Sequence, residues 1–187
     1  MKDKQVDILE AATKLFSRYG YHAVGVDRII ADSGVAKMTF YKYFPSKENL
    51  IESVLERRDK HIRDTINIGV AKRRTPNTKI KAIFEWYENW FETKDFYGCM
   101  FIKASEESPD IASKIMAISK GHKLWLKDLI SHLLEDCSIK SHEQMAIHVL
   151  AILDGLTVRE NLFKEGVKNE MKFAWRYVEE TINRKID

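Results

Sequence analysis

Apolar residues recur at helical spacing along almost the whole chain. Over residues 3–19, apolar side chains stand three or four positions apart and would share one helix face: Val6, Leu9, Ala12, Leu15, Phe16 and Tyr19. No segment keeps the two-residue alternation of a half-buried strand over a useful length. The pattern therefore predicts an all-α fold.

Glycine, proline and short polar stretches divide this pattern into separate helices. After the first helix we expect short helices at about 26–32 and 36–43, and a longer helix that opens at Pro45-Ser46 and runs toward residue 73. Residues 74–78 form a clear break. The remaining helices are predicted at about 78–94, 98–106, 109–137, 141–165 and 168–185. Gly20 lies where the first helix needs a left-handed cap.

Composition and charge narrow the class of protein. Hydrophobic residues make up 44% of the 187 positions and charged residues 32%, which suits a globular protein with a core of its own. The net charge of +3 comes entirely from residues 1–63. This favours a polyanionic partner, although an unevenly charged surface is an equal alternative. The two cysteines form no Cys-x-x-Cys pattern, and the chain has no signal peptide or membrane span, so we expect a cytoplasmic protein without a membrane partner.

The segment Val24–Phe44 has the features of a helix-turn-helix. In that motif one helix packs on the core, a tight turn follows, and a second helix enters the major groove of DNA. Ile29 and Ile30 would anchor the first helix, and Gly34 would make the turn. We therefore predict that residues 36–43 form the recognition helix.

The outward face of this recognition helix suits DNA. Phe40 and Phe44 are four residues apart and would both face inward. The side chains left to face outward are Lys37, Met38, Thr39, Tyr41, Lys42 and Tyr43. Lysines can reach guanine or phosphate oxygens, hydroxyls can bond phosphates, and methionine can touch a thymine methyl group. An exposed helix with ordinary lysines is the alternative.

Three runs of residues resemble the TetR family of bacterial regulators. Residues 8–12, with Leu15-Phe16 and Gly20-Tyr21, resemble its opening helix, and Val26–Val35 resembles its first motif helix. Thr39–Leu50 is similar to its recognition helix and to the start of its fourth helix. Many spaced positions agree at once, which makes the resemblance specific.

The resemblance implies a fold and a function for the whole chain. It implies a three-helix DNA-binding domain at 1–47, joined by a long helix to a helical effector-binding and dimerisation domain at 48–187. It also implies a homodimeric regulator, usually a repressor, that binds a palindromic operator in double-stranded DNA. A small, largely apolar effector would release the DNA. No cofactor, catalytic residue or metal site is implied.

The family's DNA contacts carry over residue by residue. Lys37, Met38 and Thr39 would contact bases, and Tyr41, Tyr43 and Lys47 would contact phosphates. Lys42 could do either, and Arg28 on the first motif helix joins this set. Lys47 also starts a helix whose N-terminus favours a phosphate.

Three positions depart from the family pattern. Gly25 and Ala36 stand where a hydroxyl residue often caps a motif helix. Gly25 can still cap but offers no hydroxyl to a phosphate, whereas the loss of such a cap at Ala36 costs about 1 kcal/mol. Met38 replaces a common small residue, so the operator sequence is open.

The later two-thirds of the chain are rich in aromatic residues. Trp86 and Trp90 share a helix face, which is typical of plain core and also of an adaptable apolar pocket. The candidate effector contacts are Trp86, Tyr87, Trp90, Cys99, Phe101, Trp125, His148 and Asn161. The last two predicted helices are too apolar for a free surface, so a dimer interface is predicted there. Its candidate residues are Ile147, Leu150, Ala151, Asp154, Val158, Trp175 and Val178.

Rival functions remain. Gly98-Cys99 resembles a family motif at a helix start, where a thiol can ionise and react, so sensing of electrophiles through Cys99 is one alternative. A small buried residue is the simpler reading of Cys99. A DNA-binding protein with no effector is the second alternative. An enzyme is disfavoured because no acid precedes a histidine by three residues and Ala146 leaves His142-Glu143 without a second histidine.

Overall fold

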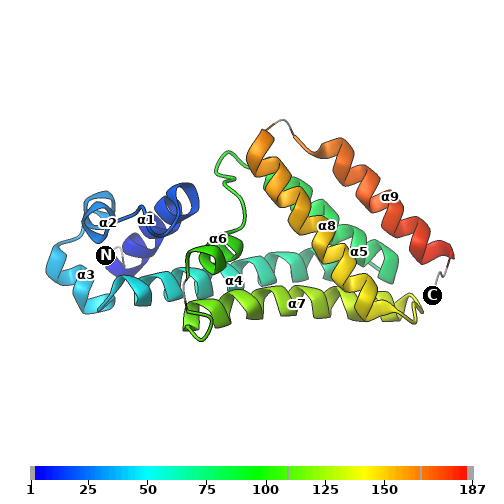
Figure 1. Ribbon diagram of the computed structural model, residues 1–187, viewed down its shortest axis with the longest axis horizontal. Helices are drawn as coiled ribbons and strands as arrows, with labels where there is room; N and C mark the ends of the chain where they lie inside the picture. Colours follow the sequence, from blue (N-terminus) through cyan, green and yellow to red (C-terminus); the bar gives the residue numbers. More distant parts are fainter. Residues whose placement is uncertain (1–2, 109, 165, 185–187) are drawn as a thin grey trace. The chain divides into compact units, whose positions relative to one another are not determined.

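The predicted all-α class is confirmed by a computed structural model that describes residues 3–108, 110–164 and 166–184. Within these residues the chain forms nine α-helices and no strand (Figure 1). Their bounds are α1 Lys4–Tyr19, α2 Val26–Ser33, α3 Lys37–Tyr43, α4 Lys47–Ala71, α5 Pro76–Phe91, α6 Met100–Glu107, α7 Lys114–Asp136, α8 His142–Phe163 and α9 Lys168–Arg184. None of the described helices is long and apolar enough to cross a membrane.

The chain divides into two compact units. Unit 1 takes the described residues within 1–60 and 99–122, and unit 2 takes those within 61–98 and 123–187. The helices α4 and α7 each contribute to both units. Residues 99–122 thus pack with the N-terminal helices, although they lie far beyond residue 47 in sequence. The functional boundary at residue 47 stays a prediction.

Unit 1 is built on the apolar stripe of α1. Asp3 caps the helix, since its side chain accepts a hydrogen bond of 3.0 Å from the Gln5 backbone N–H. In the predicted stripe, Ala12, Leu15 and Phe16 are buried and Leu9 is half-buried. Val6 and Tyr19, near the two ends of the stripe, are exposed. The helices α1, α2 and α3 pack on one another (Figure 1). The core of unit 1 forms where the apolar faces of α1, α2 and α3 meet. Side chains near the two ends of α1 therefore lie outside this core.

Two glycines follow the first two helices with positive φ angles, but only one forms the expected cap. Gly34 has φ 65° and ψ 21°, and its N–H bonds the Ile30 carbonyl at 3.1 Å. Gly20 has φ 82° but ψ 173°, so the prediction of a left-handed helical cap there is wrong. The extended ψ angle turns the chain sharply away from α1, and this conformation is essentially restricted to glycine.

Two predicted helix boundaries also need correction. The break at 74–78 is shorter than expected, because Thr75 and Thr78 form a capping box and Pro76 already begins α5. The helix expected from residue 109 begins at Lys114. Asp110 accepts a bond from the Ala112 N–H at 2.8 Å and so holds a turn first. Pro109 itself, and the predicted ends at 165 and 185, lie outside the described residues.

Candidate nucleic-acid interface

The recognition helix α3 is held from one side only. Phe40 and Phe44 are buried, as predicted, and their rings lie 6.1 Å apart. On the opposite side, Met38 is 83% exposed, and Tyr41 and Tyr43 are exposed as well. Packing thus fixes the orientation of α3 and leaves a row of long side chains in solvent.

Neither motif helix has a side-chain cap. Gly25 and Ala36 occupy the N-cap positions of α2 and α3, and neither supplies a side-chain hydrogen bond. Glycine at an N-cap costs only roughly a few tenths of a kcal/mol, whereas alanine costs about 1 kcal/mol, so the loss is larger for α3 than for α2. Packing must hold both helices in place. Ile29 beneath α2 and Phe40 beneath α3 are completely buried, which provides that packing.

Lys37 is held only weakly. Its ammonium lies 3.4 Å from a carboxylate oxygen of Asp27 on α2, and both side chains are mostly exposed. Exposed ion pairs of this kind contribute about 0–1 kcal/mol. A phosphate or a guanine edge can therefore draw Lys37 away from Asp27 at little cost.

Arg28 is positioned by an aromatic ring. Its guanidinium lies 4.3 Å from the ring centroid of Tyr19, the last residue of α1. Cation–π contacts at exposed sites contribute about 0.5–1 kcal/mol. Arg28 therefore stands on the surface as a pre-oriented cation, a placement that the sequence pattern did not reveal.

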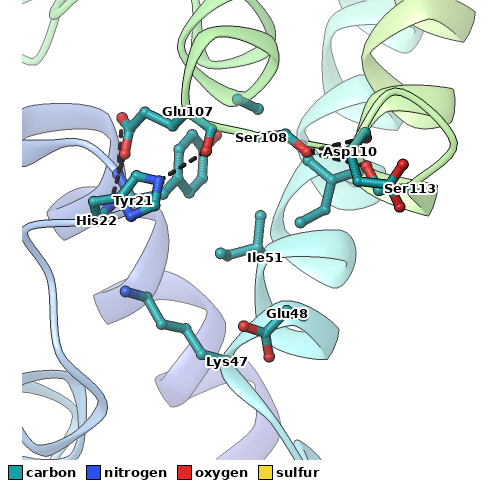
Figure 2. A pocket seen from close by; sticks show the side chains of 11 residues that line it. Tyr21, His22, Lys47, Glu48, Ile51, Glu107, Ser108, Asp110 and Ser113 are labelled. Atoms are coloured by element: carbon teal, nitrogen blue, oxygen red, sulfur yellow. Dashed lines mark hydrogen bonds between the residues drawn. The ribbon is translucent and has the colours of Figure 1, made fainter.

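Lys47 begins α4 beside a cavity of about 360 Å³ in unit 1. Figure 2 shows its side chain extending toward Tyr21 and His22, with Ile51 and Glu48 on the same helix. The pKa of the Glu48 carboxyl is lowered, first by its own backbone N–H and then by the Ser46 hydroxyl. A phosphate contact by Lys47 would need its flexible side chain to turn outward from this cavity.

Glu107 is the functional candidate that sequence reasoning missed. From the end of α6, its carboxylate accepts hydrogen bonds from the backbone N–H groups of Tyr21, at 2.9 and 3.1 Å, and of His22, at 2.6 Å (Figure 2). The His22 ring also bonds the Glu107 carbonyl at 2.7 Å. A side chain at Gly20 would place its Cβ 2.7 Å from a Glu107 oxygen. A glycine at position 20 is a sign in the sequence that another group approaches the backbone closely there. The sequence does not show that this group is Glu107.

Two further bonds attach α6 to the corner between α1 and α2. The hydroxyl of Tyr21 donates to the Met100 carbonyl at 3.0 Å, and Lys103 donates to the Ser17 carbonyl at 2.7 Å. Burial, with smaller contributions from the charges of Cys99 and Glu107, raises the pKa of Tyr21 well above its ordinary value. Within unit 1, Met100, Lys103 and Glu107 of α6 therefore hold the corner between α1 and α2, which leads into the helix-turn-helix.

Comparison with known proteins identifies the family. Residues 8–54 match the family model of the bacterial regulatory proteins of the tetR family. The HTH-type transcriptional regulator LmrA of Bacillus subtilis (strain 168) is 30% identical over 158 residues, which cover 82% of this chain and 84% of LmrA. The chain belongs to the TetR family. It is a DNA-binding transcriptional regulator, and the family resemblance seen in the sequence is confirmed.

Two other similarities agree with this assignment. The uncharacterized HTH-type transcriptional regulator YuxN of Bacillus subtilis (strain 168) is 38% identical over 121 residues, or 62% of this chain. That match spans only 41% of YuxN. The crystal structure of a TetR-family transcriptional regulator from Streptomyces coelicolor superposes with a TM-score of 0.85 at 24% identity, covering 97% of this chain and 93% of that one. The TetR fold therefore extends over the whole chain.

The predicted effector contacts of this TetR-family regulator lie in several places. In unit 2, the rings of Trp86, Tyr87 and Trp90 contact one another in tilted and edge-to-face arrangements, with ring centroids 5.3–5.7 Å apart. Trp125 lies beneath Arg63, and Asn161 approaches Gly98, where a Cβ would lie 3.2 Å from its side chain.

The other three predicted contacts differ in exposure. In unit 1, the Phe101 ring stacks on His122 at 3.9 Å, and Cys99 is 8% exposed at the N-cap of α6. In unit 2, His148 is exposed. None of the eight predicted contacts lines the cavities beside Tyr21, Glu160 or Phe173. The effector site and thiol sensing through Cys99 stay predictions.

The predicted dimer residues differ in their access to a partner. Ile147, Ala151 and Val158 are exposed on α8, as an interface requires. Leu150 is half-buried, Asp154 pairs with Lys123, and Trp175 packs on Phe84 with ring centroids 5.4 Å apart. Val178 is only 1% exposed, so its place in the interface is corrected: it belongs to the core of unit 2. Phe173 and Tyr177 on α9 are exposed as well, and Leu162 and Phe163 are exposed apolar residues of α8 that the prediction omitted.

Proposed function

We propose that the protein is a homodimeric repressor that binds a palindromic operator and leaves it when a small, largely apolar ligand binds. The exposed face of α3 carries the DNA-binding half of this proposal. Met38, Tyr41 and Tyr43 project into solvent, while Phe40 is completely buried beneath them. A helix held by its apolar side and open on the other can enter a major groove without unfolding.

Each side chain of the interface has a proposed role. Lys37, Met38 and Thr39 reach base edges, because they lie in the first turn of α3, the part of a recognition helix that points into the groove. Tyr41 and Tyr43 bond phosphate oxygens through their hydroxyls. The cations Arg28, Lys42 and Lys47 neutralise phosphates on either side of the groove, and Lys42 also lies within reach of a base.

A two-fold dimer explains the exposed apolar residues of α8 and α9. Phe173 is 70% exposed and lines a groove of about 620 Å³ together with Ile152, Leu156 and Tyr177. Contiguous apolar surface of this kind marks protein–protein contacts. Pairing this face with the same face of a second copy would present two α3 helices to the two halves of a palindrome.

We propose a small, largely apolar effector because the aromatic cluster of α5 offers apolar ring surfaces for such a molecule to contact. Trp86, Tyr87 and Trp90 bring three large rings together, and Trp86 is held by a hydrogen bond of 3.0 Å from its indole N–H to the Thr65 hydroxyl. Aromatic walls with a few placed polar groups are typical of small-molecule sites.

The DNA-binding proposal is tested by selecting a preferred sequence from a random duplex pool and measuring its affinity by gel shift. The double variant Lys37→Ala, Tyr41→Ala is expected to lose about thirtyfold or more in affinity, because base and phosphate contacts are each worth about 1–3 kcal/mol. Lys81→Ala, an exposed lysine on α5, is the matched control and keeps native affinity. Native affinity in the double variant would refute the proposed interface.

The dimer and the effector need separate tests. Phe173→Glu is expected to give a monomer in sedimentation equilibrium, whereas Lys172→Glu, its exposed neighbour on α9, stays dimeric. For the effector, aromatic and lipid-like compounds are screened by thermal shift, and stabilising compounds are then added to the DNA complex. If none stabilises the protein or releases DNA, the alternative of a DNA-binding protein with no effector replaces the repressor proposal.

A further inference from the structure

A small cavity of unit 2 lies where the last turns of α5 and α8 meet the start of α9. Its volume is about 120 Å³, and its wall combines apolar Phe91 and Met171 with the acidic side chains of Glu88, Glu92 and Glu160. A single water needs only about 10–15 Å³ of such space. The cavity therefore has room for a small molecule as well as for solvent.

Two of these carboxylates have a buried oxygen without a hydrogen-bond partner. Glu160 is only 7% exposed, and its Oε2 atom contacts neither solvent nor a donor. The Oε1 atom of Glu88 is also buried and has no hydrogen-bond donor. A buried carboxylate oxygen loses its hydration, so such atoms almost always have a donor or an ion beside them. Glu88 and Glu160 both line the same cavity, so their two unpartnered oxygens indicate a missing ligand with N–H donors.

The electrostatic setting also favours a positive charge. Glu88 lies in the last turn of α5 and Glu160 in the last turn of α8, and neither turn contains a basic residue. The C-terminal end of a helix carries a partial negative charge, which disfavours acids and favours cations. The first turn of α9 adds partial positive charge, yet no N–H group bonds the two unpartnered oxygens.

The neighbouring cations are bonded elsewhere. Lys168 lies 3.0 Å from Glu92 at the rim of the cavity. Arg159 pairs with Glu170 at 3.1 Å, and Lys164 donates to a backbone carbonyl at 2.8 Å. Among the described residues that line the cavity, three carboxylates thus share the charge of one ammonium group, and Glu88 and Glu160 each keep an oxygen without a donor.

We propose that this cavity binds a small organic cation of the alkylammonium class. Its N–H groups would donate to Glu88 and Glu160, while its carbon atoms would contact Met171 and the Phe91 ring, which also attracts a cation. Among the described residues, no group of three or more His, Cys, Asp or Glu side chains is placed to hold a metal ion. Carbon contacts together with two acceptors suit an amine better than a metal. The site does not rest on the proposed repressor function.

Isothermal titration of the full chain with butylammonium chloride at pH 7 tests this proposal. The wild-type protein is expected to bind butylammonium, whereas 1-butanol, its uncharged analogue, gives no heat. Glu160→Gln keeps the shape of the side chain and removes its charge, so it should weaken binding at least tenfold. Glu143→Gln, an exposed glutamate in the first turn of α8, is the matched control and should bind as wild type does.

A thermal melt provides a second measurement that does not depend on heats of binding. Butylammonium should raise the unfolding temperature of the wild type and of Glu143→Gln, but not that of Glu160→Gln. The proposal is overturned if butylammonium does not bind, if 1-butanol binds equally well, or if Glu160→Gln binds with native affinity. Binding of magnesium that depends on Glu160 would make this a metal site and would equally overturn it.

Discussion

Replacing Glu107 with glutamine should loosen the corner between α1 and α2 without disturbing the rest of the protein. The native carboxylate accepts two backbone N–H bonds, from Tyr21 at 2.9 Å and from His22 at 2.6 Å. A glutamine has the same shape, but it carries no charge and offers one acceptor oxygen in place of two. The Tyr21 N–H contacts both carboxylate oxygens, at 2.9 and 3.1 Å, so in either orientation of the glutamine amide one of these acceptors is replaced by an NH2 donor. Because this N–H is partly buried, water cannot freely replace the charged acceptor that it loses.

The size of the effect follows from these bonds. A hydrogen bond to a charged group contributes about 1.5–3 kcal/mol, and the exposed His22 N–H adds little because water replaces its partner. Local opening of the corner should therefore become easier by about 1.5–3 kcal/mol. Since 1.4 kcal/mol is a factor of ten, the Tyr21 amide should exchange about tenfold to a hundredfold faster with solvent deuterium.

Amide hydrogen exchange measured by NMR is the appropriate assay, because it reports on Tyr21 alone. Tryptophan fluorescence is the internal reference, since all four tryptophans belong to unit 2 and should melt as in the wild type. Glu106→Gln changes the exposed neighbouring carboxylate and should leave Tyr21 exchange unchanged. If exchange in Glu107→Gln stays within twofold of the wild-type rate, the carboxylate does not hold this corner.

Three other outcomes are expected. Gly20→Ala should lower the free energy of unfolding by about 1–3 kcal/mol, because φ 82° with ψ 173° is strained for alanine and the new Cβ would meet Glu107. A urea titration measures this change, and an unchanged urea midpoint would contradict it. Burial raises the pKa of Tyr21, so the unfolded chain releases this proton first, near pH 10, and stability falls as pH rises above that value. The urea midpoint should drop more between pH 9 and 11 in the wild type than in Tyr21→Phe, and parallel curves would be inconsistent with this burial. Operator affinity should fall steeply with salt, with a logarithmic slope of about −5 for three phosphate-binding cations in each of two protomers; a flat response would rule out those contacts.

The fold and the motif were readable from the sequence because both depend on short-range patterns. Within the described residues, the helical period placed all nine helices, although α7 begins at Lys114 rather than at residue 109. Gly34 with buried Phe40 placed the turn and the orientation of α3. The errors were local. Thr75 and Asp110 bind nearby N–H groups through their side chains, which moved the starts of α5 and α7 away from where the apolar period suggested.

The candidate sites were less predictable, because a helical period does not say which helix a buried face meets. Val178 has the pattern of an interface residue but packs inside unit 2. Asp154 is paired with Lys123 in its own chain, and its place in a dimer interface stays a prediction. Burial within a chain and burial against a second copy leave the same apolar pattern in a sequence.

Local order, by itself, determined the helices of this protein, its helix-turn-helix and the side chains that α3 exposes to solvent. These features arise between residues a few positions apart, where spacing, caps and turns act directly. The tertiary structure alone decided that Glu107 meets the backbone of Tyr21, and that Glu88 and Glu160 share one cavity. Each of these pairs is separated by more than seventy residues, and only the packing of distant helices brings such groups together.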